Sequence, residues 1–164
     1  MVSQESREDG AALSYNDHCP INRAIGLVGS RSAMLIMREA FFGTSRFDDF
    51  VQRVEMAPAT ASTHLRALTD AGLLQRRPYH EPGGRTRDEY ALTPAGADLM
   101  PVVIGLFEWG RTHTDVQPLV DFVHAGCGHP VEVRAQCTVG HAVTPDELEL
   151  RPAATLEQPG GAGQ

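Results

Sequence analysis

The sequence predicts a mainly α-helical protein with one small β-hairpin, an architecture of the α+β class. Apolar residues recur at helical spacing in several short segments between residues 19 and 113. A Gly-rich turn, Glu81-Pro82-Gly83-Gly84, separates two segments that are typical of strands. The 164 residues are enough for one ordinary domain with appendages.

Three short helices are expected at the start of the ordered chain. Pro20 suits the first position of a helix that ends at Gly29, and an apolar helix follows from about Ser32 to Gly43. Residues Arg46–Val54 then place apolar side chains at the spacing of an amphipathic helix.

A fourth helix is expected over Pro58–Asp70, with Gly72 as its stop. At about 100° per residue, Ala61, Leu65 and Leu68 share one face, which is predicted to point into the core. The outward and flanking side chains that could meet DNA are Thr60, Ser62, Thr63 and Arg66. This face is small, polar and positive, which suits close approach to base edges in a DNA groove.

A β-hairpin is expected next, with strands over Leu73–Tyr79 and Arg85–Leu92. Arg85 and Arg87 lie at the edge of its Gly-rich turn, so the tip of the hairpin is basic. Helices followed by such a hairpin predict a winged helix-turn-helix.

One long C-terminal helix is expected from Thr93-Pro94 to about His113, with Thr93 as the N-cap and Pro94 at the first helical position. Pro101 is expected to bend this helix, because it removes one backbone hydrogen bond. A small domain offers little core to cover both faces, so the helix is predicted to serve dimerisation.

The chain is expected to divide into four parts. These are a flexible arm over 1–18, a DNA-binding domain over 19–117, a small extension over 118–153 and a disordered tail over 154–164. Short strands are expected near Val131–Ala135 and Thr138–Val143, which would make the extension a hairpin.

The charge is unevenly distributed along the chain. The formal net charge is -7, and all 14 basic residues are Arg. Residues 19–90 carry ten Arg against eight acids, so the acidity lies at the two ends. An Arg-only set suits phosphate and guanine contacts, but a GC-rich genome that favours Arg codons, with which the abundant Ala, Gly and Pro agree, is the explanation that we favour.

The order of several short motifs resembles the HxlR-type winged-helix transcriptional regulators over residues 19–116. The motifs are Cys19-Pro20, Arg46-Phe47, Leu65-Arg66-Ala67-Leu68, Gly72-Leu73, Arg87-Asp88-Glu89-Tyr90-Ala91-Leu92-Thr93 and Trp109-Gly110. The resemblance implies a cytoplasmic bacterial homodimer that binds double-stranded operator DNA as a repressor or dual regulator. It further implies that the helix from Pro58 enters the major groove, that the hairpin tracks the adjacent groove or backbone, and that the first and last helices form the dimer interface.

Two residues depart from the family pattern. Ser32 stands where Trp is common, and Ala57 stands where Ser is common at the start of the recognition helix. Because an N-cap Ser→Ala change costs about 1 kcal/mol, this helix is expected to begin loosely.

The DNA-binding candidates are Arg46, Thr60, Ser62, Thr63, Arg66, Arg85 and Arg87. The alternative interpretation is an ordinary solvated helix face and a soluble hairpin tip. Arg66 suits a guanine, and the hairpin arginines suit phosphates, which are contacted in every sequence.

Cys19 is a candidate thiol sensor, because it directly precedes a helix amino terminus, where the dipole favours the thiolate. The resemblance adds that some similar regulators use an early cysteine in this way. The alternative is a small, half-buried residue at a dimer contact. A small-molecule or electrophile effector is the expected partner besides DNA.

No cofactor is expected, with one open alternative at the C-terminal end. Cys127, His129, Cys137 and His141 are zinc-ligand candidates, but their spacing lacks the paired C-x-x-C of strong zinc motifs. Three cysteines in a chain without a secretion signal predict reduced thiols rather than a disulfide framework.

An enzyme or a membrane protein is not expected. The chain has no apolar run of about 18 residues, and no Walker, G-x-S-x-G or H-E-x-x-H sequence. The alternative function is a redox, electrophile or metal sensor module whose DNA binding is secondary or absent.

Overall fold

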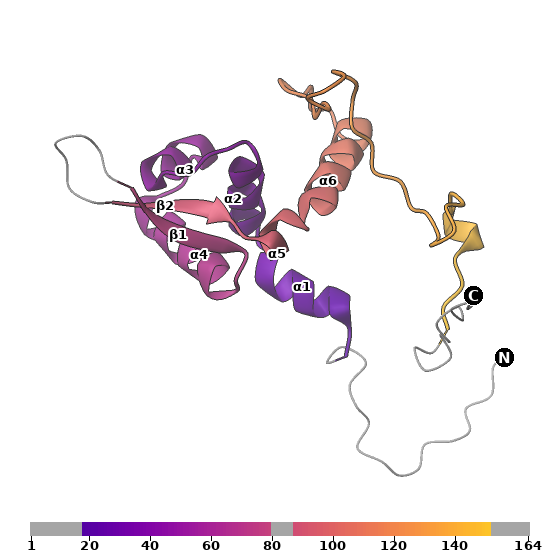
Figure 1. Ribbon diagram of the computed structural model, residues 1–164, viewed down its shortest axis with the longest axis horizontal. Helices are drawn as coiled ribbons and strands as arrows, with labels where there is room; N and C mark the ends of the chain where they lie inside the picture. The colour runs from indigo at the N-terminus through magenta and orange to yellow at the C-terminus, as the bar shows by residue number, and fades with distance from the viewer. Residues whose placement is uncertain (1–17, 80–86, 152–164) are drawn as a thin grey trace, which may run out of the picture. The chain divides into compact units, whose positions relative to one another are not determined.

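The computed structural model describes residues 18–79 and 87–151, in two compact units that divide between Val116 and Gln117. The elements of the first unit are α1 (Pro20–Val28), α2 (Arg31–Phe41), α3 (Phe47–Val54), α4 (Pro58–Asp70), β1 (Leu74–Tyr79), β2 (Arg87–Leu92), α5 (Pro94–Ala97) and α6 (Met100–His113). Helices followed by an antiparallel hairpin confirm the predicted α+β winged helix-turn-helix (Figure 1). No helix of the described residues is long and apolar enough to cross a membrane.

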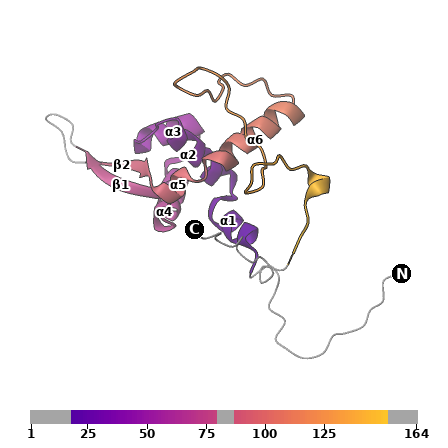
Figure 2. The same ribbon diagram turned by 45° about the vertical axis from the view of Figure 1, so that its right-hand side comes forward.

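Helix α2 is the centre of the first unit. It contacts α1, α3, α4, α6 and β2, and its Ile36 and Met37 are completely buried. In both views α3, α4 and the hairpin lie on one side of α2, and α1 and α6 lie on the other (Figures 1 and 2). The apolar side chains that α3, α4 and β1 add to this core are Phe50, Val54, Leu65, Leu68 and Leu74.

The hairpin is joined to the start of α3 by a third, very short strand segment. Arg46 forms a single β-bridge with Glu89, and the backbone N–H of Tyr90 donates to the carbonyl of Ser45 at 2.7 Å. The ring of Tyr90 packs edge-on against that of Phe50, with 6.1 Å between centroids. Backbone and side chain together therefore hold β2 against α3.

The predicted long C-terminal helix is two helices, and the prediction of one continuous helix was wrong. Thr93 caps α5 as expected, since its Oγ1 accepts from the N–H of Gly96 at 3.0 Å. The chain then turns at Asp98–Leu99 and restarts as α6. Pro101 is the second residue of α6, where its missing N–H removes no internal helix hydrogen bond.

A close backbone approach holds the end of the hairpin to α5. The Thr93 hydroxyl donates to the carbonyl of Gly72 at 2.6 Å, and the Thr93 N–H donates to that of Leu73 at 3.1 Å. A Cβ on Gly96 would lie only 2.0 Å from the Leu73 carbonyl oxygen. The position therefore requires glycine because of contact with backbone.

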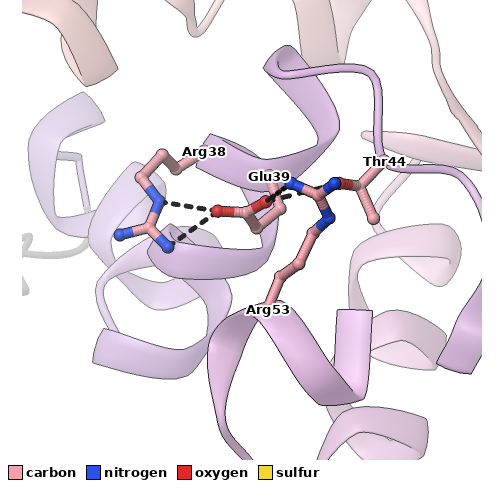
Figure 3. A network of polar contacts seen from close by, with 4 residues as sticks. All are labelled: Arg38, Glu39, Thr44 and Arg53. Carbon is pink, nitrogen blue, oxygen red and sulfur yellow. Dashed lines mark hydrogen bonds and ion pairs between the residues drawn. The ribbon is translucent and has the colours of Figure 1, made fainter. Parts of the chain in front are cut away.

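The buried carboxylate of Glu39 links α2 to α3 (Figure 3). Its Oε1 accepts from Nε and Nη2 of Arg38 at 3.1 and 2.8 Å, and its Oε2 accepts from the Thr44 hydroxyl at 3.3 Å. Arg53, in the last turn of α3, approaches Oε2 at 3.9 Å. Since Glu39 is 4% exposed, these partners replace the water that the carboxylate loses.

The second unit contains tight turns and no described strand, so the expected strands near Val131–Ala135 and Thr138–Val143 were wrong. Isolated β-bridges join Val123 to Pro130 and Gln136 to Ala142, and a 3-10 helix, η1, spans Pro145–Glu147. None of the described residues 117–151 is buried. The β-branched residues therefore lack the neighbouring strands and core contacts that make a strand stable. The disordered tail expected over 154–164, and all of the arm expected over 1–18 except His18, lie outside the described residues.

Replacing Gly96 by Ala is expected to destabilise the protein by about 1–3 kcal/mol, because the new Cβ overlaps a backbone carbonyl that cannot rotate away. Urea unfolding followed by circular dichroism measures this. Gly26→Ala is the matched control: it lies inside α1 with no atom within 4 Å of its Cβ position, so alanine there should be neutral or stabilising. Equal midpoints for the two variants would contradict the packing at Gly96.

Candidate nucleic-acid interface

Helices α3 and α4 form a helix-turn-helix whose turn is made by a residue in a left-handed conformation. Glu55 has φ 53° and ψ 50° and ends α3. The next N–H, that of Met56, donates back to the carbonyl of Val51 at 3.2 Å, which satisfies the end of the helix. The chain can then leave in a new direction and begin α4 within three residues.

The two faces of α4 are as predicted. Ala61, Leu65 and Leu68 are at most 1% exposed. On the other side Thr60, Thr63 and Arg66 are exposed, and Ser62 is half-buried. The Thr63 hydroxyl donates to the carbonyl of Ala59 at 3.0 Å, so the side chain offers mainly its methyl group and an acceptor.

Arg46 and Arg87 both line a cleft between the start of α3 and the hairpin. The cleft has a volume of about 760 Å³. The Arg46 guanidinium lies 4.9 Å from the centre of the Tyr79 ring, a cation–π contact. Nη1 of Arg87 lies 3.9 Å from Oδ2 of Asp48. Arg85 lies outside the described residues.

Two arginines of β1, Arg76 and Arg77, are exposed and were not among the predicted DNA-binding residues. The hairpin register pairs Arg77 with Glu89 and Tyr79 with Arg87. Because side chains alternate along a strand, Arg77 shares a face with Arg87. The two consecutive arginines within a predicted strand could have indicated a further basic residue beside Arg87. Because side chains alternate along a strand, one of the two arginines lies on each face of the hairpin.

Cys19 is the N-cap residue of α1 and is half-buried. Its carbonyl accepts the N–H of Arg23 at 3.1 Å, and its side chain makes no capping hydrogen bond. This is the position at the helix amino terminus that the sequence indicated.

The metal-ligand candidates of the second unit do not gather around one point. Nδ1 of His124, which was not among the candidates, contacts Sγ of Cys127 at 3.3 Å, whereas Nδ1 of His129 contacts the Cys127 carbonyl at 3.0 Å. Hydrogen bonds from the backbone of Val139, and then of His141, lower the pKa of the Cys137 thiol. Within residues 18–79 and 87–151, no three His, Cys, Asp or Glu side chains form a metal-binding group.

An apolar groove of about 430 Å³ lies on the side of the first unit formed by α1 and α6. It is lined by Ile21, Ala24, Ile25, Val28, Gly29, Ser30, Arg31, Met34, Leu99, Val102 and Leu106. Ile21 is 69% exposed and Leu106 is 53% exposed, and Trp109, further along α6, is 61% exposed. This surface coincides with the dimer interface that the family resemblance implied.

The helix-turn-helix, the small polar face of α4 and the arginines beside the hairpin define a winged helix-turn-helix regulator of the DNA-binding type. The chain belongs to the HxlR-like helix-turn-helix family, whose model matches residues 27–118. The resemblance found in the sequence is thereby confirmed.

Known proteins similar to this chain have names that agree with this family. The uncharacterized HTH-type transcriptional regulator Rv3095 of Mycobacterium tuberculosis is 36% identical over 80% of this chain and 84% of its own length. The crystal structure of PA1607, described as a candidate transcription factor, has a TM-score of 0.73 and 26% identity, and covers 82% of this chain and 94% of its own. The structure of the redox regulator HypR in its oxidized form has a TM-score of 0.54 and 27% identity. The match covers 60% of this chain and the whole of the HypR chain.

Adding an N-cap to α4 is expected to stabilise the protein. Ala57 makes no side-chain hydrogen bond to the start of α4, so Ala57→Ser should raise the free energy of unfolding by about 1 kcal/mol. Ser30→Ala is the reverse case, because Ser30 Oγ accepts from the Ala33 N–H at 3.1 Å, and it should lower that free energy by about 1 kcal/mol. Chemical denaturation measures both changes, and a loss of stability in Ala57→Ser would contradict the cap geometry.

Proposed function

We propose that two copies of this chain bind one operator on double-stranded DNA and repress, or both repress and activate, transcription. The observation that supports this best is the outward face of α4, where small polar side chains and Arg66 stand opposite a fully buried stripe. A helix with that face can approach base edges closely, whereas long acidic or lysine side chains would hold it away.

The α4 residues are proposed to contact bases and nearby phosphates. Arg66 is exposed and can place its planar fork against O6 and N7 of a guanine. Thr63 offers its methyl group to a thymine methyl, because its hydroxyl proton is used within the helix. Thr60 and Ser62 are short enough to contact phosphates or base edges without separating the helix from the groove.

Arg46 and Arg87 are proposed to contact phosphates beside the groove. Both lie in the cleft where the start of α3 meets the hairpin, so they can reach the same stretch of backbone. Phosphate contacts position a protein on the duplex and do not distinguish sequences. Phosphate contact by Arg85, which lies outside the described residues, remains a prediction of the same kind.

A homodimer is proposed through α1 and α6. Their exposed apolar residues border one groove, and a two-fold axis there would cover the same surface on both copies. Two α4 helices related by that axis could reach half-sites separated by about one helical turn, or 34–36 Å, or by multiples of it.

We further propose that the chain is a cytoplasmic DNA-binding protein and not an enzyme. A small molecule or an electrophile would control how much of the operator DNA it occupies. Cys19 is the proposed point for a thiol signal, since it occupies the N-cap of α1 beside the proposed interface. The named redox function of HypR supports this alternative by likeness only. That the second unit binds no metal stays a prediction, and zinc binding by this unit is the alternative.

Arg66 and Arg87 are expected to affect DNA binding in different ways. Arg66→Ala should weaken binding to the operator by about 1–3 kcal/mol and relax the choice of one base pair. Arg87→Gln should weaken binding to all duplexes similarly and reduce the slope of log K against log salt by up to about 0.9. Recovered genomic fragments supply the operator, and fluorescence anisotropy over a salt series measures both effects.

The matched control for both variants is Arg23→Ala, which removes the same charge from α1. It should bind DNA like the wild type. Wild-type protein that fails to bind any duplex at low salt would contradict the proposed function, and an unchanged operator affinity in Arg66→Ala would remove that residue from the interface.

The apolar groove is expected to be covered in solution. Leu106→Glu should give a monomer by sedimentation equilibrium, because a carboxylate would be buried against apolar side chains of the second copy. Gln52→Glu adds the same charge to the exposed surface of α3 and should leave the dimer intact. A monomeric wild type, or a dimeric Leu106→Glu variant, would contradict the proposed interface.

A further inference from the structure

The cleft between α3 and the hairpin contains negative charge at the point where phosphate binding is proposed. Asp48 stands in the first turn of α3 and faces Arg87, the first residue of β2, at 3.9 Å. The side chains are 84% and 61% exposed, so both remain accessible to a partner. Asp49 and Asp88 also line the cleft, as does Arg46, whose guanidinium lies over the Tyr79 ring.

We propose that Asp48 is an internal competitor that limits phosphate binding by Arg87. This inference rests on the proposed DNA-binding function and names a residue that attenuates it. A DNA phosphate and the Asp48 carboxylate are both anions, and Arg87 offers its guanidinium fork to either of them.

The exchange of Asp48 for a DNA phosphate at Arg87 affects the affinity for DNA and its dependence on salt. When Arg87 approaches DNA with Asp48 beside it, the pair carries little net charge, so fewer counterions leave the DNA than for a lone arginine. The affinity for DNA of any sequence is therefore lower, and its salt dependence is shallower. Binding then depends more on the base contacts of α4, which Asp48 does not affect.

Competition for Arg87 differs from simple repulsion of DNA by acidic residues. Repulsion would act on the duplex whether or not Arg87 is present, and Asp49, the next residue of α3, would contribute to it similarly. Competition acts only through Arg87. The two mechanisms therefore differ in whether removing the arginine removes the effect of the carboxylate.

The test is a double-mutant cycle on a mixed-sequence duplex, which needs no known operator. Wild type, Asp48→Asn, Arg87→Gln and the double variant are compared by anisotropy between about 50 and 200 mM salt. Asp48→Asn should bind about two- to fivefold more tightly, the range that an exposed ion pair allows, with a steeper salt slope. In the Arg87→Gln background the same substitution should have no effect, and Asp49→Asn should change affinity less than Asp48→Asn.

Each other outcome overturns the inference. An unchanged affinity in Asp48→Asn shows that Asp48 does not limit binding, and an equal gain in the Arg87→Gln background shows repulsion alone. Both leave the proposed function standing, because the wild type still binds DNA. Absence of binding by all variants that have wild-type circular dichroism overturns the proposed function together with this inference.

Discussion

The attachment of the hairpin to the start of α3 through Tyr90 is the contact on which the surface proposed for DNA binding depends. Its N–H bonds the Ser45 carbonyl at 2.7 Å while its ring packs against the buried Phe50. A register shift of one residue would turn the Tyr90 ring to solvent and move Arg87 to the opposite face of the hairpin. The placement of Arg87 and Tyr79 in the cleft beside the start of α3 therefore depends on this register. The close approach at Gly96 fixes the other end of the same strand pair.

Local electrostatics, and not the net charge of -7, decide what this surface can bind. The middle of the chain is the basic part, yet the folded protein offsets some of that charge itself. Arg87 faces Asp48, and Arg38 and Arg53 face the buried Glu39. Of these three arginines only Arg87 is proposed to contact DNA, and its pairing with Asp48 would leave a larger share of the binding energy to the proposed contacts of α4 with bases. That balance suits a regulator that must leave non-specific DNA readily.

Local patterns were sufficient to predict most of the fold and part of the site. The helical spacing of Ala61, Leu65 and Leu68 predicted which face of α4 is buried, and the Gly-rich turn predicted the hairpin. The break before α6 escaped prediction because the same Pro101 can bend a helix or begin one, and tertiary packing decides between them. The contact of His124 with Cys127 also escaped, since it depends on the turn at Gly126, where a Cβ would lie 2.9 Å from the histidine ring.

Helix α2 connects the surface proposed for dimerisation with the surface proposed for DNA. It packs on α1 and α6 on one side and on α3, α4 and β2 on the other, and its Ile36 and Met37 have no exposed surface. A closely packed helix transmits displacement, because its neighbours cannot yield without opening cavities. A change in the packing of α1, whose N-cap is Cys19, would therefore act on α2, and also on α4, which α1 contacts directly. The buried Glu39 adds a polar link between the end of α2 and Arg53, which lies in the half of α3 that leads into α4.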